Sequence, residues 1–176
     1  KRMEEQIHSL SITDSLTGLH NRRGFITLAE QQMKFSDRHQ RDMLLFFADL
    51  DGMKRINDTL GHEEGDAALI DVAAILKETF RSSDIIARVG GDEFAILAID
   101  ATEISPETIM TRLKNQINEH NKKEKRYYKI SISMGIARYD PENPCSLDDL
   151  MSRADKLMYA QKRSKKRSGI IRVKSV

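Results

Sequence analysis

Residues 84–100, DIIARVGGDEFAILAID, constrain the fold more than any other part of the sequence. Two apolar runs stand on either side of Gly90, Gly91, Asp92 and Glu93, which is the pattern of a β-hairpin with a glycine turn. Because the two strands of a hairpin are antiparallel, a doubly wound parallel sheet is disfavoured.

Hydrophobic periodicity predicts the other elements. Helices are expected at residues 23–38, 52–58, 63–80, 105–121 and 146–163, and the end of an amphipathic helix at 3–12. Strands are expected at 42–51, 129–139 and 169–173, and a turn-rich stretch at 14–23. This order predicts that residues 14–176 form one α/β sandwich domain.

The amino-terminal residues 1–13 are interpreted as the end of a signalling or linker helix. Met3, Ile7 and Leu10 recur there at helical spacing. The sequence begins at Lys1 without an initiator Met, which indicates a piece of a longer protein with an upstream domain. Two interpretations of the apolar stripe stay equal: it pairs with a second copy of the helix, or it packs on its own domain.

The composition is that of a globular protein without a membrane span. Of the 176 residues 32% are charged and 39% hydrophobic, and no apolar stretch approaches the ~20 residues that cross a bilayer. The single cysteine, Cys145, cannot form an internal disulfide, and the amino end carries no secretion signal. We therefore expect a cytoplasmic location, either alone or as the cytoplasmic part of a larger sensor that can be membrane-bound, and no direct membrane contact by these residues.

Two acidic clusters stand at the ends of expected strands. Asp49 and Asp51 end one strand and point to one face of it, unless the strand has already ended, and Asp92 and Glu93 occupy the hairpin turn. One explanation is conformational, because strand ends and turns favour Asp and Gly. The other is functional: if that strand lies beside the hairpin, Asp49 and Asp92 converge, and converging carboxylates repel without a cation or proton between them. Such oxygen ligands suit Mg²⁺, which usually keeps waters and shares a substrate phosphate.

Groups suited to phosphate follow the first acidic cluster. The segment GMKRIND (52–58) places free backbone N–H groups at a helix start, beginning at Gly52 and Met53, where a triphosphate can bind. Lys54 and Lys162 are candidates for further positive charge, although a single lysine is more often a surface residue. Neither the P-loop pattern nor GxGxxG is present, so neither a P-loop nor a dinucleotide fold is indicated.

Four motifs follow one another in the order and spacing of a known family. The sequence resembles the GGDEF-domain diguanylate cyclases in DSLTGLHNRRGF (14–25), FADLDGMKRINDTLGHEEGD (47–66), RVGGDEF (88–94) and ADKLMYAQK (154–162). The resemblance covers nearly the whole chain from Asp14 onward. It implies the GGDEF fold, a mainly antiparallel central sheet with surrounding helices, similar to the palm of nucleotide cyclases and polymerases.

The resemblance also implies roles for the acidic residues. Asp49, Asp92 and the backbone carbonyl of Leu50 would bind Mg²⁺ or Mn²⁺. Glu93 would be needed for catalysis, close to the attacking 3′-hydroxyl and the metals.

Further positions correspond to substrate contacts in the family. Asn57 and Asp66 would contact guanine, since a carboxylate can accept from its N1–H and N2 amine. Lys54 and Lys162 would contact phosphate. Many members carry an Arg in a GRN stretch four residues after the second lysine; here Lys166 keeps the charge without the bidentate fork, within Lys165-Lys166-Arg167.

Arg81-Ser82-Ser83-Asp84 matches the family's RxxD site for inhibition by the product. The bare pattern would usually mean an ion pair at a helix end, but Arg81 and Asp84 stand at the family's distance from the glycine turn. Arg88 is a candidate for a further contact to bound cyclic di-GMP.

The function implied is the condensation of two GTP molecules into cyclic di-GMP and pyrophosphate, in bacterial signal transduction. Because one domain would hold one GTP, a homodimer is expected, under an upstream sensory domain. The alternative is a catalytically silent receptor for GTP or cyclic di-GMP. A nucleic-acid-binding module using the basic runs 122–126 and 162–167 is disfavoured, because the acidic pocket would repel phosphates without metal.

Overall fold

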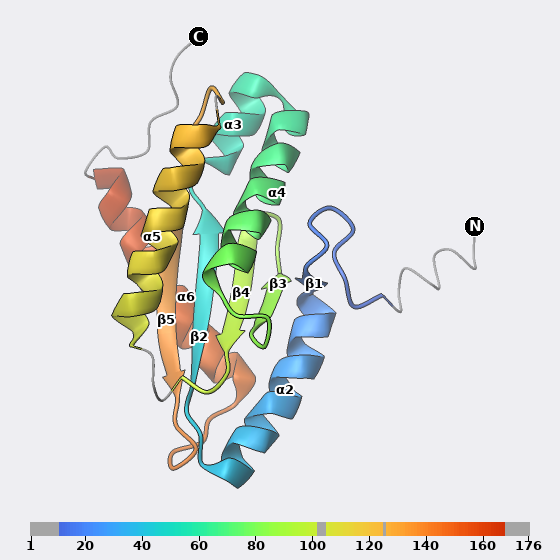
Figure 1. Cartoon of the computed structure of the whole chain (residues 1–176), viewed down its shortest axis with the longest axis vertical. Helices are drawn as coiled ribbons and strands as arrows, with labels where there is room; N and C mark the ends of the chain where they lie inside the picture. Colours follow the sequence, from blue (N-terminus) through green and yellow to red (C-terminus); the bar gives the residue numbers. More distant parts are fainter. Residues whose placement is uncertain (1–10, 102–104, 125, 168–176) are drawn as a thin grey trace.

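The computed structural model describes residues 11–101, 105–124 and 126–167. Within these ranges a single sheet of five strands is covered by helices on both faces (Figure 1). The strand expected at 169–173 lies outside the described residues. So does the helix end expected at 3–12, except for residues 11 and 12, which are not helical.

The strand order is β1-β3-β4-β2-β5, with β1 parallel to β3 and the other neighbouring pairs antiparallel. The strands are β1 (His20–Asn21), β2 (Met43–Leu50), β3 (Ile85–Arg88), β4 (Glu93–Ala98) and β5 (Ile132–Tyr139). The predicted hairpin is present as β3 and β4, and the mainly antiparallel α/β fold is confirmed. The short β1 was missed, since it lies in a stretch expected to be turns.

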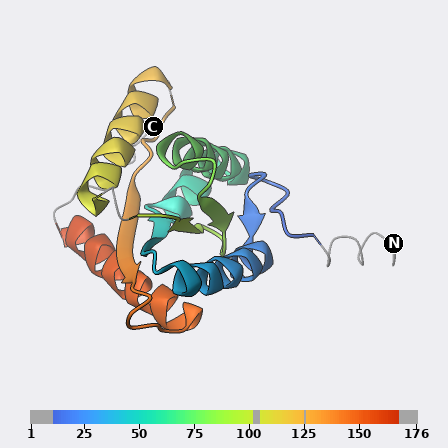
Figure 2. The same ribbon diagram turned by 60° about the horizontal axis from the view of Figure 1, so that its bottom comes forward.

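The helices form one layer on each face of the sheet (Figure 2). They are α2 (Arg22–His39), α3 (Met53–Leu60), α4 (His62–Thr79), α5 (Pro106–Lys123) and α6 (Leu147–Arg167). One hydrophobic core joins the sheet to α4 and α5, and the other joins it to α2 and α6. In the described residues no helix is both long and apolar enough to span a bilayer.

The central strand β2 is buried along all eight of its residues because both faces are covered. Leu44 and Phe46 belong to the core under α4 and α5, whereas Leu45 and Phe47 belong to the core under α2 and α6. By the same alternation, Asp49 at the end of the strand points to the α6 face.

Helix α6 packs unusually close to β5. A Cβ added to Gly135 would lie 1.9 Å from the carbonyl oxygen of Ala154 and 2.3 Å from the backbone nitrogen of Met158. The helix starts as expected, with the hydroxyl of Ser146 accepting from the N–H of Asp149 at 3.1 Å. It continues four residues beyond its expected end, to Arg167. This additional turn reaches the acidic end of β2.

Candidate active site

The two acidic clusters meet at one end of the sheet because β2 and the hairpin are neighbours. Asp49 pairs in register with Glu93, and the backbone N–H of Leu50 donates to the carbonyl of Asp92 at 3.0 Å. The functional interpretation of the acids required β2 to lie beside the hairpin, and it does.

The ionised form of the Asp49 carboxylate is disfavoured by its surroundings. It is only 5% exposed, and burial raises its pKa to about 6. The Lys162 ammonium, 2.5 Å from its Oδ1, opposes the rise, while the negative charges of Asp92 and Asp51 add to it. Such a site favours a cation beside the carboxylate.

Asp51 lies just beyond the end of β2, and its surroundings differ from those of Asp49. Its carboxylate accepts hydrogen bonds from the hydroxyls of Ser131 and Ser133 and from the ammonium of Lys165. Since β2 ends at Leu50, the alternation of a strand does not apply to Asp51, although the lysine partners of both carboxylates come from α6. Asp51 does not line the pocket described next.

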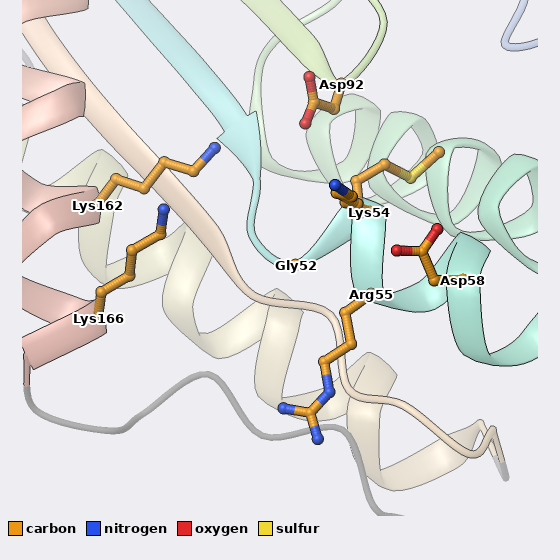
Figure 3. A pocket seen from close by; sticks show the side chains of 8 residues that line it. Gly52, Lys54, Arg55, Asp58, Asp92, Lys162 and Lys166 are labelled. Atoms are coloured by element: carbon orange, nitrogen blue, oxygen red, sulfur yellow. The ribbon is translucent and has the colours of Figure 1, made fainter.

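An open pocket of about 490 Å³ lies beside the acidic end of β2 (Figure 3). Six residues that the sequence had singled out line it: Gly52, Met53, Lys54, Asp92, Lys162 and Lys166. Lys162 and Lys166 both extend from α6 toward the end of β2. They face the start of α3 across the pocket, so positive side chains and a helix amino terminus line one space.

The start of α3 depends on Gly52. This residue is the N-cap of the helix, with φ +79°, a left-handed conformation that residues other than glycine rarely adopt. Because glycine has no side chain, it leaves the pocket open at this point. The backbone of the first turn is thereby accessible to a ligand.

Two further residues of α3, Arg55 and Asp58, line the same pocket and were not anticipated. A signal existed in the sequence, because Asp58 follows Lys54 by one helical turn and Arg55 by three residues. Counting helical spacing from Lys54 would have placed Lys54, Arg55 and Asp58 on neighbouring parts of one helix.

Asn57 and Asp66 lie apart from the pocket lining, at the junction of α3 and α4. The Oδ1 atom of Asn57 is buried without a hydrogen-bond partner, and a Cβ on Gly65 would lie 1.9 Å from it. Asp66 follows Gly65 directly and is exposed. An unpartnered acceptor therefore adjoins an exposed carboxylate at this junction.

Glu93 begins β4 and folds its side chain back over the glycine turn. A Cβ on Gly90 would lie 2.4 Å from the Oε2 atom of Glu93, and the N–H of Val89 donates to the Glu93 carbonyl at 2.9 Å. The absence of a side chain at Gly90 thus makes room for the Glu93 carboxylate.

Arg81 and Asp84 line a second cavity, of about 360 Å³, which shares no lining residue with the first. Lys77 and His20 also line it and were not anticipated. The Asp84 carboxylate accepts from the N–H of Arg81 at 2.8 Å and from that of Ile99 at 3.1 Å, so it also holds the local backbone.

Arg88 is not among the residues that line the second cavity. Its guanidinium donates to the carbonyl of Gly91 at 2.8 Å and lies 3.3 Å from the Asp14 carboxylate. Through these two contacts, Arg88 connects the glycine turn to the segment before β1.

Comparisons with known proteins identify the same family. Residues 11–168 match the family model described as Diguanylate cyclase, GGDEF domain. The chain is 37% identical over 168 residues to the probable diguanylate cyclase DgcE of Escherichia coli, covering 92% of this chain but 15% of that protein. It is 34% identical to the probable diguanylate cyclase DgcC of the same organism, again over 92% of this chain and 43% of that protein. The chain thus spans less than half the length of these relatives.

Solved structures agree with the family assignment. The coiled coil and GGDEF domain of DgcB from Caulobacter crescentus, in complex with c-di-GMP, matches with a TM-score of 0.78 at 28% identity, over 93% of this chain and 86% of that one. The diguanylate cyclase SiaD from Pseudomonas aeruginosa, in complex with its activator SiaC, matches with the same TM-score at 26% identity, over 93% of this chain and 65% of that one. With matching sequence and fold, the chain belongs to the GGDEF-domain family of diguanylate cyclases.

Proposed function

We propose that this domain is an active diguanylate cyclase that joins two GTP molecules into cyclic di-GMP and releases pyrophosphate. The observation that carries the proposal is the buried Asp49 carboxylate meeting Asp92 at the end of β2, beside a pocket lined by Lys54, Lys162 and Lys166. Acids for a metal and cations for phosphates are what a metal-dependent nucleotidyl transfer needs.

The residues at the end of β2 fit Mg²⁺ or Mn²⁺. Among the described residues no three His, Cys, Asp or Glu side chains are grouped to hold a metal. The proposed donors are the carboxylates of Asp49 and Asp92 and the carbonyl of Leu50, a small set of oxygen atoms that suits an ion that keeps waters and shares substrate phosphates. Bound there, the metal would polarise the phosphate and stabilise charge on the attacking and leaving oxygens.

The chain's own residues bind and orient the triphosphate. We assign Lys54, Lys162 and Lys166 to its oxygens, together with the backbone N–H groups after Gly52. Glu93 is assigned to the attacking 3′-hydroxyl, whose proton its carboxylate can accept. The 3′-oxygen bonds to the α-phosphorus of the partner GTP as the bond to pyrophosphate breaks.

Two such domains must face each other, because each holds one GTP and each 3′-hydroxyl attacks the other's α-phosphate. We therefore propose a homodimer as the catalytic unit, aligned by an upstream sensory domain. The lengths of DgcE and DgcC support further domains in the intact protein. Use of GTP supports a cytoplasmic location.

The basic runs do not favour nucleic acid as the ligand. Lys162 and Lys165 are paired with Asp49 and Asp51. In the other run Lys122 is paired with Glu119, 3.0 Å away, and Arg126 with Asp71. Four basic residues of these runs are thus paired with acids of the same domain.

The deciding experiment is incubation of the protein with GTP and Mg²⁺, with the product identified by mass. Cyclic di-GMP, 3′,5′-linked, is the expected product. GTP binding without turnover would instead support the catalytically silent receptor.

Base choice should depend on Asn57 and Asp66. The wild-type protein should prefer GTP to ATP by at least about 100-fold, since adenine lacks the donors that pair with these acceptors. Asp66→Ser should reduce that preference, whereas Glu63→Ser, which removes an exposed charge from the same helical turn, should preserve it. Steady-state rates with both nucleotides measure the ratio, and equal use of the two by the wild type would refute the assignment.

Product inhibition should require Arg81. Its guanidinium can bind a phosphate or a guanine edge of cyclic di-GMP bidentately, and Lys77 in the same cavity adds charge. Arg81→Ala should remove inhibition by added cyclic di-GMP and keep the uninhibited rate, while Arg38→Ala, an exposed arginine of α2, should change neither. Wild-type turnover indifferent to cyclic di-GMP would eliminate this site.

A further inference from the structure

The last turns of α6 are attached to the sheet by polar contacts on one stripe of the helix. Going down the helix, the Oε1 atom of Gln161 accepts from the N–H of Met134 at 2.7 Å, and the ammonium of Lys165 donates to the carbonyl of Ile132 at 2.5 Å. Both partners belong to β5, the last strand of the sheet in the part of the chain that the structure describes. Gln161 and Lys165 are four residues apart, so they lie one above the other on α6.

The attachment at Lys165 is a buried and well-connected network. Its ammonium lies 2.9 Å from the Asp51 carboxylate, whose side chain is 0% exposed. The hydroxyls of Ser131 and Ser133 donate to the two oxygens of that carboxylate at 2.7 and 2.6 Å. Asp51 and Lys165 thus satisfy each other's charge and hydrogen bonds away from the pocket, and neither is offered to a ligand.

The next stripe of the same helix carries the pocket lysines. Lys162 follows Gln161 by one residue and Lys166 follows Lys165 by one residue, so each pocket lysine stands beside an anchoring residue. Lys166 belongs to the last turn of the described helix, where a helix without tertiary contacts frays. Lys165 supplies such a contact at that turn.

We infer that Lys165, through Asp51, Ser131 and Ser133, is a positioning residue for triphosphate binding: it holds the end of α6 against β2 and β5 so that Lys162 and Lys166 point into the pocket. This inference rests on the proposed function. The inference goes beyond the proposed function because it assigns a role in binding to residues that touch no substrate. Holding charged groups in place before the ligand arrives lowers the entropy lost on binding.

The test compares a ligand with phosphates and one without. Binding of a non-hydrolysable GTP analogue with Mg²⁺, and of guanosine, is measured by titration for the wild type and for Lys165→Met. The variant should bind the analogue at least about tenfold more weakly, the loss expected of one charge-assisted contact, and guanosine within about twofold of the wild type. The matched control is Arg163→Met, which removes an exposed charge from the same turns of α6 and should leave both affinities within about twofold.

A second variant separates positioning from general stability. Lys165→Met alone leaves the buried Asp51 carboxylate without its cation, which should lower the unfolding temperature. Asp51→Asn combined with Lys165→Met removes both charges and should recover much of that temperature, yet analogue binding should stay weak. Ser133→Ala is a milder change in the same network. It should also weaken binding of the analogue, but by less than Lys165→Met does.

The inference would be overturned if Lys165→Met bound the analogue as the wild type does, or lost both ligands equally. Recovery of analogue affinity together with stability in the double variant would also overturn it. A wild-type protein that bound neither ligand would instead refute the proposed function, and this inference with it. Analogue affinity and guanosine affinity therefore report the two claims separately.

Discussion

Asp92→Asn should abolish the formation of cyclic di-GMP without unfolding the protein. The carboxylate lies with that of Asp49 near the end of β2, and the change removes a proposed metal ligand while the amide keeps the shape of the side chain. Since metal stabilisation of transferring phosphate contributes several kcal/mol and each 1.36 kcal/mol is tenfold, turnover should fall by at least about 10³-fold. Asp49→Asn and Glu93→Ala should have the same consequence.

The fold should tolerate Asp92→Asn because the structural contact there is made by the backbone. The carbonyl of Asp92 accepts from the N–H of Leu50, and the substitution leaves that bond in place. Asp58→Asn is the matched control, a carboxylate that lines the same pocket from α3, and should retain most turnover. Rates of cyclic di-GMP formation and thermal unfolding are measured together. A well-folded Asp92→Asn variant with full turnover would contradict the metal assignment.

Gly135→Ala, which adds a single methyl group, should strongly destabilise the domain. The added Cβ would lie 1.9 Å from the carbonyl oxygen of Ala154, a backbone atom that cannot rotate aside. To relieve the clash α6 must move off β5, which should cost about 3 kcal/mol and lower the unfolding temperature by about 6–12 °C. Because α6 carries Lys162 and Lys166, triphosphate affinity should fall as well.

Gly91→Ala is the control for this stability effect. A Cβ at Gly91 meets no atom within 4 Å, so stability should change by no more than about 0.5 kcal/mol. Denaturant unfolding of both variants beside the wild type measures the difference. Equal stability of Gly135→Ala and the wild type would show that α6 is not held as closely as this packing requires.

The hairpin was predictable because its signal is local. Apolar runs around a glycine turn specify β3 and β4 with no information from the rest of the chain. The two residues of β1 carry no comparable signal, since their pairing partners in β3 lie far along the sequence. The end of α6 was predicted too early for a related reason: its last turn is charged, and what holds it is a contact with Asp51 rather than an apolar stripe.

The site was predictable in its residues more than in its contacts. Gly52, Lys54, Lys162 and Lys166 were each singled out by type and position, and they line one pocket. That Lys162 also pairs with Asp49 could not be foreseen, because it depends on how far α6 slides along β5. That register is set by the close approach at Gly135.

The place of β2 in the sheet bears on how the chain can be assembled during synthesis. The strand ends at Leu50, yet its two neighbours, β4 (Glu93–Ala98) and β5 (Ile132–Tyr139), are translated much later. Until Tyr139 has left the ribosome, one edge of a strand that is apolar except for Asp49 has no partner and is open to pairing with other chains. The acids at its tip wait longer still, because their lysine partners come from α6 (Leu147–Arg167), so the site is completed only after the sheet.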